Sequence, residues 1–284
     1  GEFNSDYVNF FADDIHLLSG KIVGATNSII NGDSLAYVPF FTKSSLFSFT
    51  PYTKEFLLKS LGDTVYMYDD FIFFGDIYFD SENLNGTGKI SFINYDIESA
   101  HFYFSKNGIA SADANFSILQ NRKNKKIQFS TQSTSLEYTF NDKNIFLYKN
   151  NYPFVLNDIS YLVDFDFALL DLDNQQIDFK NNNISSQGVL TALSYGRKAF
   201  DYNSLDANFN LVDNELCVAE GIQLEIKKFW IQPEGNRFCV MSNGDFPVFE
   251  NCTLIKKRWL LKDKLINNKN VIIKPSLKHV ILDN

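Results

Sequence analysis

Residues Leu84 to Leu119 read LNGTGKISFINYDIESAHFYFSKNGIASADANFSIL, and this stretch decides the fold class. Apolar and polar residues alternate along it, and Gly or Asn-Gly separates the alternating runs. Because successive side chains of a β-strand point to opposite faces, this alternation indicates half-buried strands. We expect strands at residues 88–93, 99–104 and 109–119. Lys106-Asn107-Gly108 suits a tight hairpin turn, since Asn-Gly tolerates the positive φ of primed turns.

Most of the 284 residues follow the same pattern. Short alternating runs recur at intervals of roughly 8–12 residues, which is typical of β-sandwiches, barrels and solenoids. Aromatic residues make up 16% of the chain, which also favours strands. Only residues 53–61 show weak helical periodicity, which predicts a turn of helix. We therefore expect an all-β fold of mainly antiparallel strands in an elongated stacked-sheet, jelly-roll or sandwich-like arrangement.

Turns and charge suggest a division of the chain into four parts. These are an N-terminal β segment (1–83), a central β segment (84–180), a C-terminal β segment (181–255) and a Lys-rich basic tail (256–284). The four could equally form one continuous β domain. The whole chain carries a formal charge of −8, which repels phosphate backbones and argues against nucleic acid as the main partner.

The cysteines Cys217, Cys239 and Cys252 contain no C-x-x-C pair, so they match neither a zinc ribbon nor a thioredoxin-type motif. An odd number leaves at least one thiol unpaired, and the sequence leaves their disulfide state open. No apolar run approaches the ~20 residues that span a bilayer, so we predict no transmembrane segment. The chain begins Gly-Glu-Phe-Asn-Ser without Met, and we expect a piece of a longer polypeptide.

Two regions carry a resemblance to known families. Residues 84–118, and residues 198–240 (KAFDYNSLDANFNLVDNELCVAEGIQLEIKKFWIQPEGNRFCV) with the following FENCTLI (249–255), resemble repeat units of very large β-rich envelope proteins of the Bacteroidota. The second region also resembles the strand pattern of the lipopolysaccharide-transport family of stacked jelly-roll sheets. The resemblance implies a bacterial cell-envelope setting, periplasmic or outer-membrane associated, or secretion. It brings no catalytic residues.

Four aspartates form a candidate acidic face. Alternation would place two of them on one face of a strand and the other two likewise, so either pair could act as the acid and base of a glycosidase or bind calcium. The four are Asp164, Asp166, Asp171 and Asp173. An EF-hand loop starting at Asp171 would need Gly at Gln176 and Glu at Asn182. Alternation with Phe and Leu is also what the solvent face of a strand looks like, and we favour that interpretation.

Other motifs offer weaker chemistry. Gly32-Asp33-Ser34-Leu35 matches the nucleophile block of GDSL-type esterases, but the Asp-x-x-His pattern at Asp13 and His16 precedes it, and Ser276 stands where His279 would need Asp. We interpret the motif as a turn. The three histidines, which include His101, are too scattered to suggest a metal site.

Exposed aromatic rings could offer a stacking platform for sugars. The candidates are Tyr66, Tyr68, Trp230 and the run 71–74, although aromatics at this density are more often core residues.

These observations predict no catalytic residue, no metal and no cofactor. The leading hypothesis is a non-catalytic structural or interaction segment of a larger bacterial cell-envelope protein. Its partner would be a protein in the envelope or the rest of its own polypeptide, reached in part by strand addition at exposed sheet edges. The alternatives are a lipid or lipopolysaccharide carrier with an apolar groove, and a carbohydrate-binding or carbohydrate-active β protein.

Overall fold

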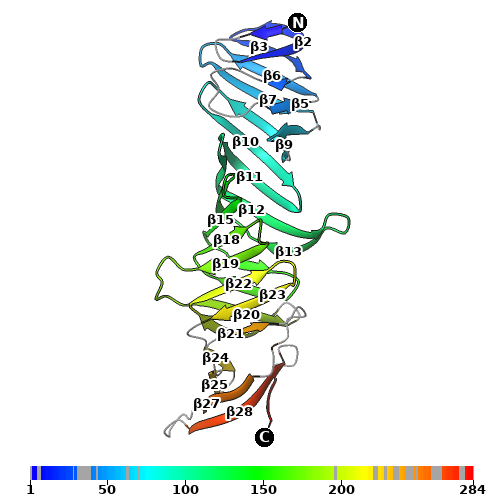
Figure 1. The fold of residues 1–284 in the computed structure, drawn as a ribbon. Coiled ribbons are helices and arrows are strands. Elements are labelled where there is room, and N and C mark those ends of the chain that lie inside the picture. The colour runs from blue at the N-terminus through cyan, green and yellow to red at the C-terminus, as the bar shows by residue number, and fades with distance from the viewer. Residues whose placement is uncertain are drawn as a thin grey trace. The chain divides into compact units, whose positions relative to one another are not determined.

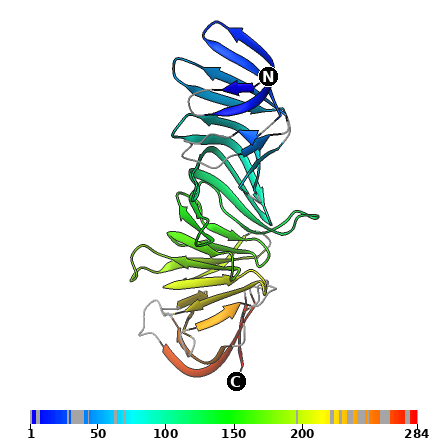
Figure 2. The same ribbon diagram turned by 45° about the horizontal axis from the view of Figure 1, so that its top comes forward.

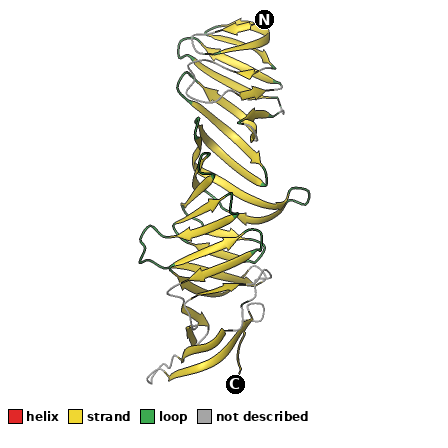
Figure 3. Cartoon of the chain, viewed as in Figure 1, coloured by secondary structure: helices red, strands yellow, loops and turns green. Residues whose placement is uncertain are grey.

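The computed structural model describes residues 2–4, 8–27, 29–30, 40–42, 44–61, 64–68, 71–194, 197–219, 223–226, 229–232, 237–240, 246, 249–256, 264–274 and 279–283. In these ranges the chain forms strands joined by turns, with no helix (Figure 3). The strands pair antiparallel in a large sheet system that is not closed into a barrel. The all-β prediction is confirmed.

The chain divides into two compact units. Unit 1 comprises residues 1–125 and 135–142, and unit 2 comprises residues 126–134 and 143–284. This division differs from the four segments expected from the sequence, because the 83/84 boundary falls inside unit 1 and the 180/181 and 255/256 boundaries fall inside unit 2.

Unit 1 contains two columns of strands (blue to cyan-green in Figure 1). The long column pairs, in order, β1 (Glu2–Asn4), β2 (Asn9–Leu18), β3 (Lys21–Thr26), β6 (Ser45–Thr50), β7 (Glu55–Ser60), β9 (Phe71–Phe79), β10 (Leu84–Phe92), β11 (Tyr95–Phe104), β12 (Gly108–Asn121) and β14 (Thr134–Thr139). The short column pairs β4 (Ile29–Ile30), β5 (Phe40–Thr42) and β8 (Val65–Met67). The chain crosses repeatedly between the two.

Strand β9 joins the two columns. Its first residues pair with β8 and its last four pair with β7, so the short column joins the long column at this strand. Gly75 lies where the partner changes, opposite Gly88 of β10. Their φ angles are +151° and +150°, and a Cβ on Gly75 would lie 2.1 Å from the Thr87 carbonyl oxygen. Only glycine allows both this backbone conformation and this close approach of the strands.

The core of unit 1 is built largely from phenylalanine rings. Phe3 lies 5.1 Å from Phe10 and 5.5 Å from Phe47, measured between ring centroids. A Cβ on Gly86 would lie 2.9 Å from the rings of both Phe73 and Phe104, so this glycine leaves the space that they fill. Alternation therefore works as predicted in strands such as β9 and β11, which bury one face.

Unit 2 repeats the two-column arrangement with longer-range pairing (green to red in Figure 1). The first column pairs β13 (Lys126–Ser130), β16 (Phe154–Leu156), β17 (Tyr161–Asp164), β20 (Gly188–Ser194), β21 (Arg197–Ser204), β24 (Gln223–Ile226), β25 (Phe229–Gln232), β27 (Phe249–Lys256), β28 (Lys264–Lys274) and β29 (His279–Asp283). The second column pairs β15 (Asn144–Lys149), β18 (Phe167–Asp171), β19 (Gln176–Lys180), β22 (Asp206–Asn210), β23 (Glu215–Ala219) and β26 (Arg237–Val240).

Consecutive hairpins of unit 2 belong to alternate columns (Figure 2). The chain makes β16–β17 in the first column, β18–β19 in the second, β20–β21 in the first and β22–β23 in the second. Rings from the two columns meet in the core: Phe154 of the first lies 5.7 Å from Phe179 of the second. The sandwich-like prediction holds within this unit. Residues 264–274 and 279–283, which were predicted as a basic tail, form strands of its first column.

A disulfide bond and a buried side-chain hydrogen bond also stabilise unit 2. Cys217 and Cys239 are opposite one another on β23 and β26 and form a disulfide, while Cys252 is buried and is not part of this disulfide. Between these two cysteines the chain forms β24 and β25 in the first column and then returns to the second column at β26. Gln128 is buried, and its side-chain amide donates a 2.7 Å hydrogen bond to the Leu211 carbonyl oxygen in the β22–β23 turn.

The turns use different chemistry from that expected. Six of the described turns have four residues and end in a non-glycine residue with positive φ: Lys54, Lys125, Lys143, Ser160, Gln175 and Asn214. In the opening stretch the β10–β11 turn uses Ile93 (φ 46°), whereas Gly86 and Gly88 lie inside strand β10. The prediction that Gly or Asn-Gly separates all the alternating runs is therefore wrong at the β10–β11 turn.

Two local predictions have mixed outcomes. The hairpin at 106–108 is confirmed, since the Ser105 N–H donates to the Gly108 carbonyl oxygen, but neither Asn107 nor Gly108 has positive φ. A Cβ on Gly108 would lie 2.1 Å from the Tyr138 carbonyl oxygen, so glycine is needed there for strand packing instead. The helical turn expected at residues 53–61 is wrong, because 51–54 form a turn and 55–60 form strand β7.

Candidate functional site

The outward face of the long column of unit 1 carries the concave sites of this unit. Strand register places one row of side chains across it, in the order His16, Val23, Ser48, Leu57, Tyr78, Asn85 and Tyr103. Residues directly opposite on antiparallel strands point to the same face, so this row lies on one surface. Its members are exposed or half-buried, unlike the buried row next to it.

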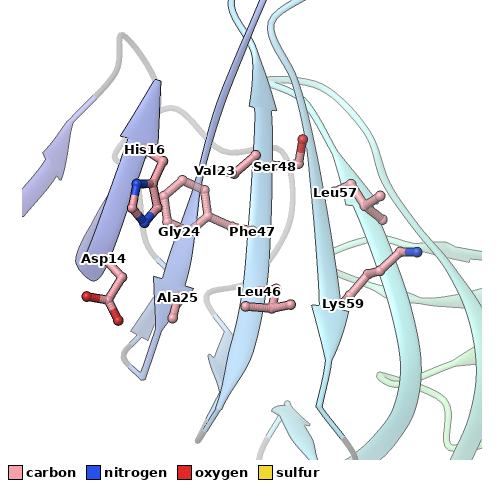
Figure 4. Close-up of a pocket in the computed structure, with 10 residues that line it drawn as sticks. All are labelled: Asp14, His16, Val23, Gly24, Ala25, Leu46, Phe47, Ser48, Leu57 and Lys59. Atoms are coloured by element: carbon pink, nitrogen blue, oxygen red, sulfur yellow. The ribbon is translucent and has the colours of Figure 1, made fainter. Parts of the chain in front are cut away.

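An apolar hollow of about 430 Å³ lies on this face (Figure 4). Its centre consists of Val23, Ala25, Leu46 and Leu57 over Gly24. Figure 4 shows His16 and Asp14 on one side of the hollow and Lys59 on the other.

The sequence forms this hollow through small side chains. Ala25 and Ser48 leave space between the larger Leu46 and Leu57, which come from neighbouring strands. Gly24 lies opposite Phe47, and a Cβ there would come within 2.7 Å of the Phe47 ring. A larger residue at position 24 therefore does not fit beneath the hollow. A β-bulge between Asp13 and His16 sets the edge of the hollow, with Asp14 at φ 49°.

A second hollow of about 290 Å³ adjoins the first and shares Ser48 and Leu57 with it. It is mostly polar. Its polar side chains include Lys21, Thr50, Glu55, Asp80, Asn83 and Asn85, beside the ring of Tyr78. Phe56 and Phe79 form its apolar part.

Asp80, which lines this second hollow, stabilises the turn between β9 and β10. Its Oδ1 accepts hydrogen bonds from the Glu82 N–H at 2.7 Å and the Asn83 N–H at 2.8 Å. Partial burial acts to raise its pKa, but these bonds together with the Asn83 side chain hold the pKa below its usual value.

Of the four aspartates of the predicted acidic face, Asp164 ends β17 and Asp166 precedes β18, whereas Asp171 ends β18 and Asp173 lies in the turn after it. Asp164 forms an ion pair with Lys149, and the Asp166 carboxylate accepts a 2.9 Å hydrogen bond from the Asn182 N–H. At the other end, Asp173 pairs with Lys143 at 2.8 Å.

Asp171 accepts hydrogen bonds from the Asn174 and Asp173 N–H groups, which hold its pKa low. Strand geometry separates Asp166 from Asp171 by about 16 Å. Each of the four therefore has a structural partner, and neither of the two hollows contains any of them.

The other predicted candidates are dispersed. Residues 31–39, with the Gly32-Asp33-Ser34-Leu35 motif, lie outside the described residues, as do the side chain of His279 and residue Ser276. His16 borders the apolar hollow, while His101 is an exposed residue of β11.

The predicted aromatic platform does not form as a set. The Tyr68 hydroxyl donates to the Ser105 carbonyl oxygen, and burial raises the pKa of Tyr68. Phe71 and Phe73 are core residues, whereas Phe74 is exposed. Tyr78 and Tyr103, which the sequence analysis did not single out, are exposed outer-face rings instead. Their alternation with buried Ile77 and Phe79, and with Phe102 and Phe104, was the available signal.

One group of side chains has metal-ligand composition. Glu215, Cys217 and Cys239 have their ligand atoms within 4.8 Å of one another. Both sulfurs are joined in the disulfide, so they are not thiolates that could bind a metal.

No protein-family model, curated protein or solved structure matches the chain. In the part of the chain that is described, no helix is sufficiently long and apolar to cross a membrane.

Proposed function

We propose that this chain is a non-catalytic structural or interaction segment of a larger bacterial cell-envelope protein, and that the apolar hollow of unit 1 receives apolar side chains of a protein partner. The observation that carries the proposal is the apolar lining of this hollow on an outward sheet face, with Leu46 47% exposed. Strand β2 adds exposed Phe11, Ile15 and Leu18 beside it. Apolar surface gathered in this way is typical of protein interaction sites.

The charged side chains at the edge of the apolar hollow favour a particular kind of partner segment. Asp14 lies on one side of the hollow and Lys59 on the other, separated by apolar side chains. A partner segment with apolar residues between a basic and an acidic one would complement both ends.

The core favours this proposal over a lipid or lipopolysaccharide carrier. A carrier would use the many phenylalanines to line an accessible groove, but many of these rings, such as Phe73, Phe102 and Phe129, are fully buried against other side chains. The partners of the four aspartates likewise favour structural roles over glycosidase chemistry. The Cys217–Cys239 disulfide supports an oxidising setting such as the periplasm or the exterior.

The test compares capture of envelope proteins by three forms of the full chain: wild type, Leu46→Arg and the control Val212→Arg. Val212 is 69% exposed in a turn of unit 2, so its substitution adds the same charge away from the hollow. We expect a protein captured equally by wild type and V212R to be depleted about tenfold or more with L46R. Identical capture by all three forms would contradict the proposal. Native mass spectrometry that detects a lipid on wild type but not on L46R would favour the carrier.

A further inference from the structure

Two exposed tyrosine rings lie beside the polar hollow of unit 1. Tyr78 lies opposite Asn85, which in turn lies opposite Tyr103. The two rings are 44% and 56% exposed and stand on the same outward row. Because neighbouring strands are about 4.8 Å apart, their backbones are about 10 Å apart. The rings therefore flank Asn85, which also lines the hollow.

The hollow offers both hydrogen-bond donors and acceptors. Lys21 and Asn85 have N–H groups, and Glu55 and Asn85 have acceptor oxygens. The carboxylate of Asp80 is occupied by the β9–β10 turn. The charges of Lys21, Glu55 and Asp80 sum to −1, so the hollow does not attract an anionic ligand.

We infer that the outward face formed by Tyr78, Asn85, Tyr103 and the polar hollow is a binding site for a neutral oligosaccharide. A pyranose ring has an apolar C–H face, which stacks on an aromatic ring, and hydroxyl groups around its edge. The amphipathic tyrosine ring suits the first, and side chains such as Asn85 and Glu55 suit the second. Two rings on strands whose backbones are about 10 Å apart would contact different sugar units of an extended glycan.

The lining distinguishes this ligand from other classes. An acyl chain fits the adjacent apolar hollow better, since polar groups of the second hollow would lose their contact with water without gaining partners. A phosphate or sulfate would approach Glu55 and Asp80 with only Lys21 to attract it. The site lies beside the surface proposed for the protein partner and shares Ser48 and Leu57 with it, but its two tyrosine rings do not line that surface.

The test measures binding of the full chain to four neutral hexasaccharides, namely cellohexaose, chitohexaose, maltohexaose and mannohexaose, with hexagalacturonate as a charged comparison. Isothermal titration calorimetry gives each Kd. We expect at least one neutral hexasaccharide to bind more tightly than hexagalacturonate. Tyr78→Ala should weaken that binding about tenfold and Tyr103→Ala about threefold, because each removes a stacking surface.

The matched control is Tyr152→Ala, which removes a ring that is 52% exposed in unit 2 and should leave Kd within about twofold. Equal thermal unfolding midpoints for all variants would show that they remain folded. Absence of binding by all four neutral sugars at millimolar concentration would overturn the inference. Binding unchanged by Tyr78→Ala, or tightest for hexagalacturonate, would also overturn it.

Discussion

The two units share a two-column arrangement but fill it differently. Unit 1 packs phenylalanine rings against one another and over glycines, as Phe73 and Phe104 do at Gly86. Unit 2 packs more Leu, Ile and Val, such as Leu147, Leu170 and Ile177, beside rings such as Phe165 over Gly188. In both units the alternation of apolar and polar residues along a strand decides which face is buried. The shape of each buried side chain then decides which neighbouring side chains can pack against it.

The units also differ in how they fasten strands that are distant in sequence. Unit 1 relies on close backbone approach at the Gly75–Gly88 pair. Unit 2 uses a covalent bond between Cys217 and Cys239 and the buried side chain of Gln128. The stability of unit 1 should therefore be most sensitive to side-chain atoms added at this glycine pair. The stability of unit 2 should be most sensitive to loss of the disulfide or of the Gln128 hydrogen bond.

The largest effect is expected from Gly75→Ala. The added Cβ would meet the Thr87 carbonyl oxygen at 2.1 Å in a backbone conformation that alanine disfavours, so unit 1 should lose about 3 kcal/mol or more. Hydrogen exchange read by mass spectrometry should show faster exchange in β7 to β10 and unchanged exchange in unit 2.

Gly20→Ala is the control for this experiment. Gly20 also has positive φ (+76°), but a Cβ there would meet nothing within 4 Å, so its cost should be only about 1 kcal/mol. Equal losses from the two substitutions would mean that strand approach is unimportant at Gly75.

The second effect concerns the disulfide of unit 2. The double variant Cys217→Ala/Cys239→Ala should destabilise unit 2 by about 3 kcal/mol, because the bond closes a loop with a sequence separation of 22. Urea denaturation and hydrogen exchange would measure the loss, which should be absent from unit 1. Dithiothreitol should have a similar effect on wild type and none on the double variant; sensitivity of the double variant to dithiothreitol would refute this assignment.

The smallest effect is expected at acid pH, where both units contain carboxylates with lowered pKa. In unit 2, hydrogen bonds from Asn174 lower the pKa of Asp171. In unit 1, burial acts to raise the pKa of Asp96, but Lys89, Ser91 and Arg122 lower it overall. Each carboxylate therefore adds stability above the unfolded-state value of 3.8, and this stability is lost as pH falls through the lower folded-state pKa.

Replacing each carboxylate by its amide should reveal these contributions. Asp96→Asn and Asp171→Asn should each reduce stability at neutral pH by about 1 kcal/mol or less and flatten its decline below about pH 4. Thermal unfolding from about pH 3 to 7 would measure both. A decline as steep in either variant as in wild type would show that the replaced carboxylate is not responsible.

The fold class could be predicted because alternation is a local signal. Phe102 and Phe104 lie two residues apart in the strand predicted at residues 99–104, and both are buried. Turn chemistry was less visible, since Ile93 or Gln175 with positive φ has no residue-type signature. Glycine was misinterpreted at Gly86 and Gly88, where the local sequence does not reveal the rings or the strand that approach them.

The candidate site could not be predicted because it depends on strand partners. Alternation tells which face Tyr78 and Tyr103 share with their own neighbours, but not that Asn85 lies between them. Likewise, three cysteines allow three pairings, and only the β23–β26 pairing brings Cys217 opposite Cys239. The pairing register of strands that are distant in sequence therefore determines these neighbours, and the local alternation of residues does not reveal it.

The alternation of hairpins in unit 2 constrains how such a protein can change in length. Residues 154–180 and residues 188–219 each supply one hairpin to each column. Deleting one hairpin would shorten one column alone, whereas deleting two consecutive hairpins would bring β13 beside β20 and β15 beside β22 with strand directions still antiparallel. Insertions and deletions should therefore be tolerated in steps of two hairpins, roughly 30 residues, although the sequence shows no exact repeat of that length.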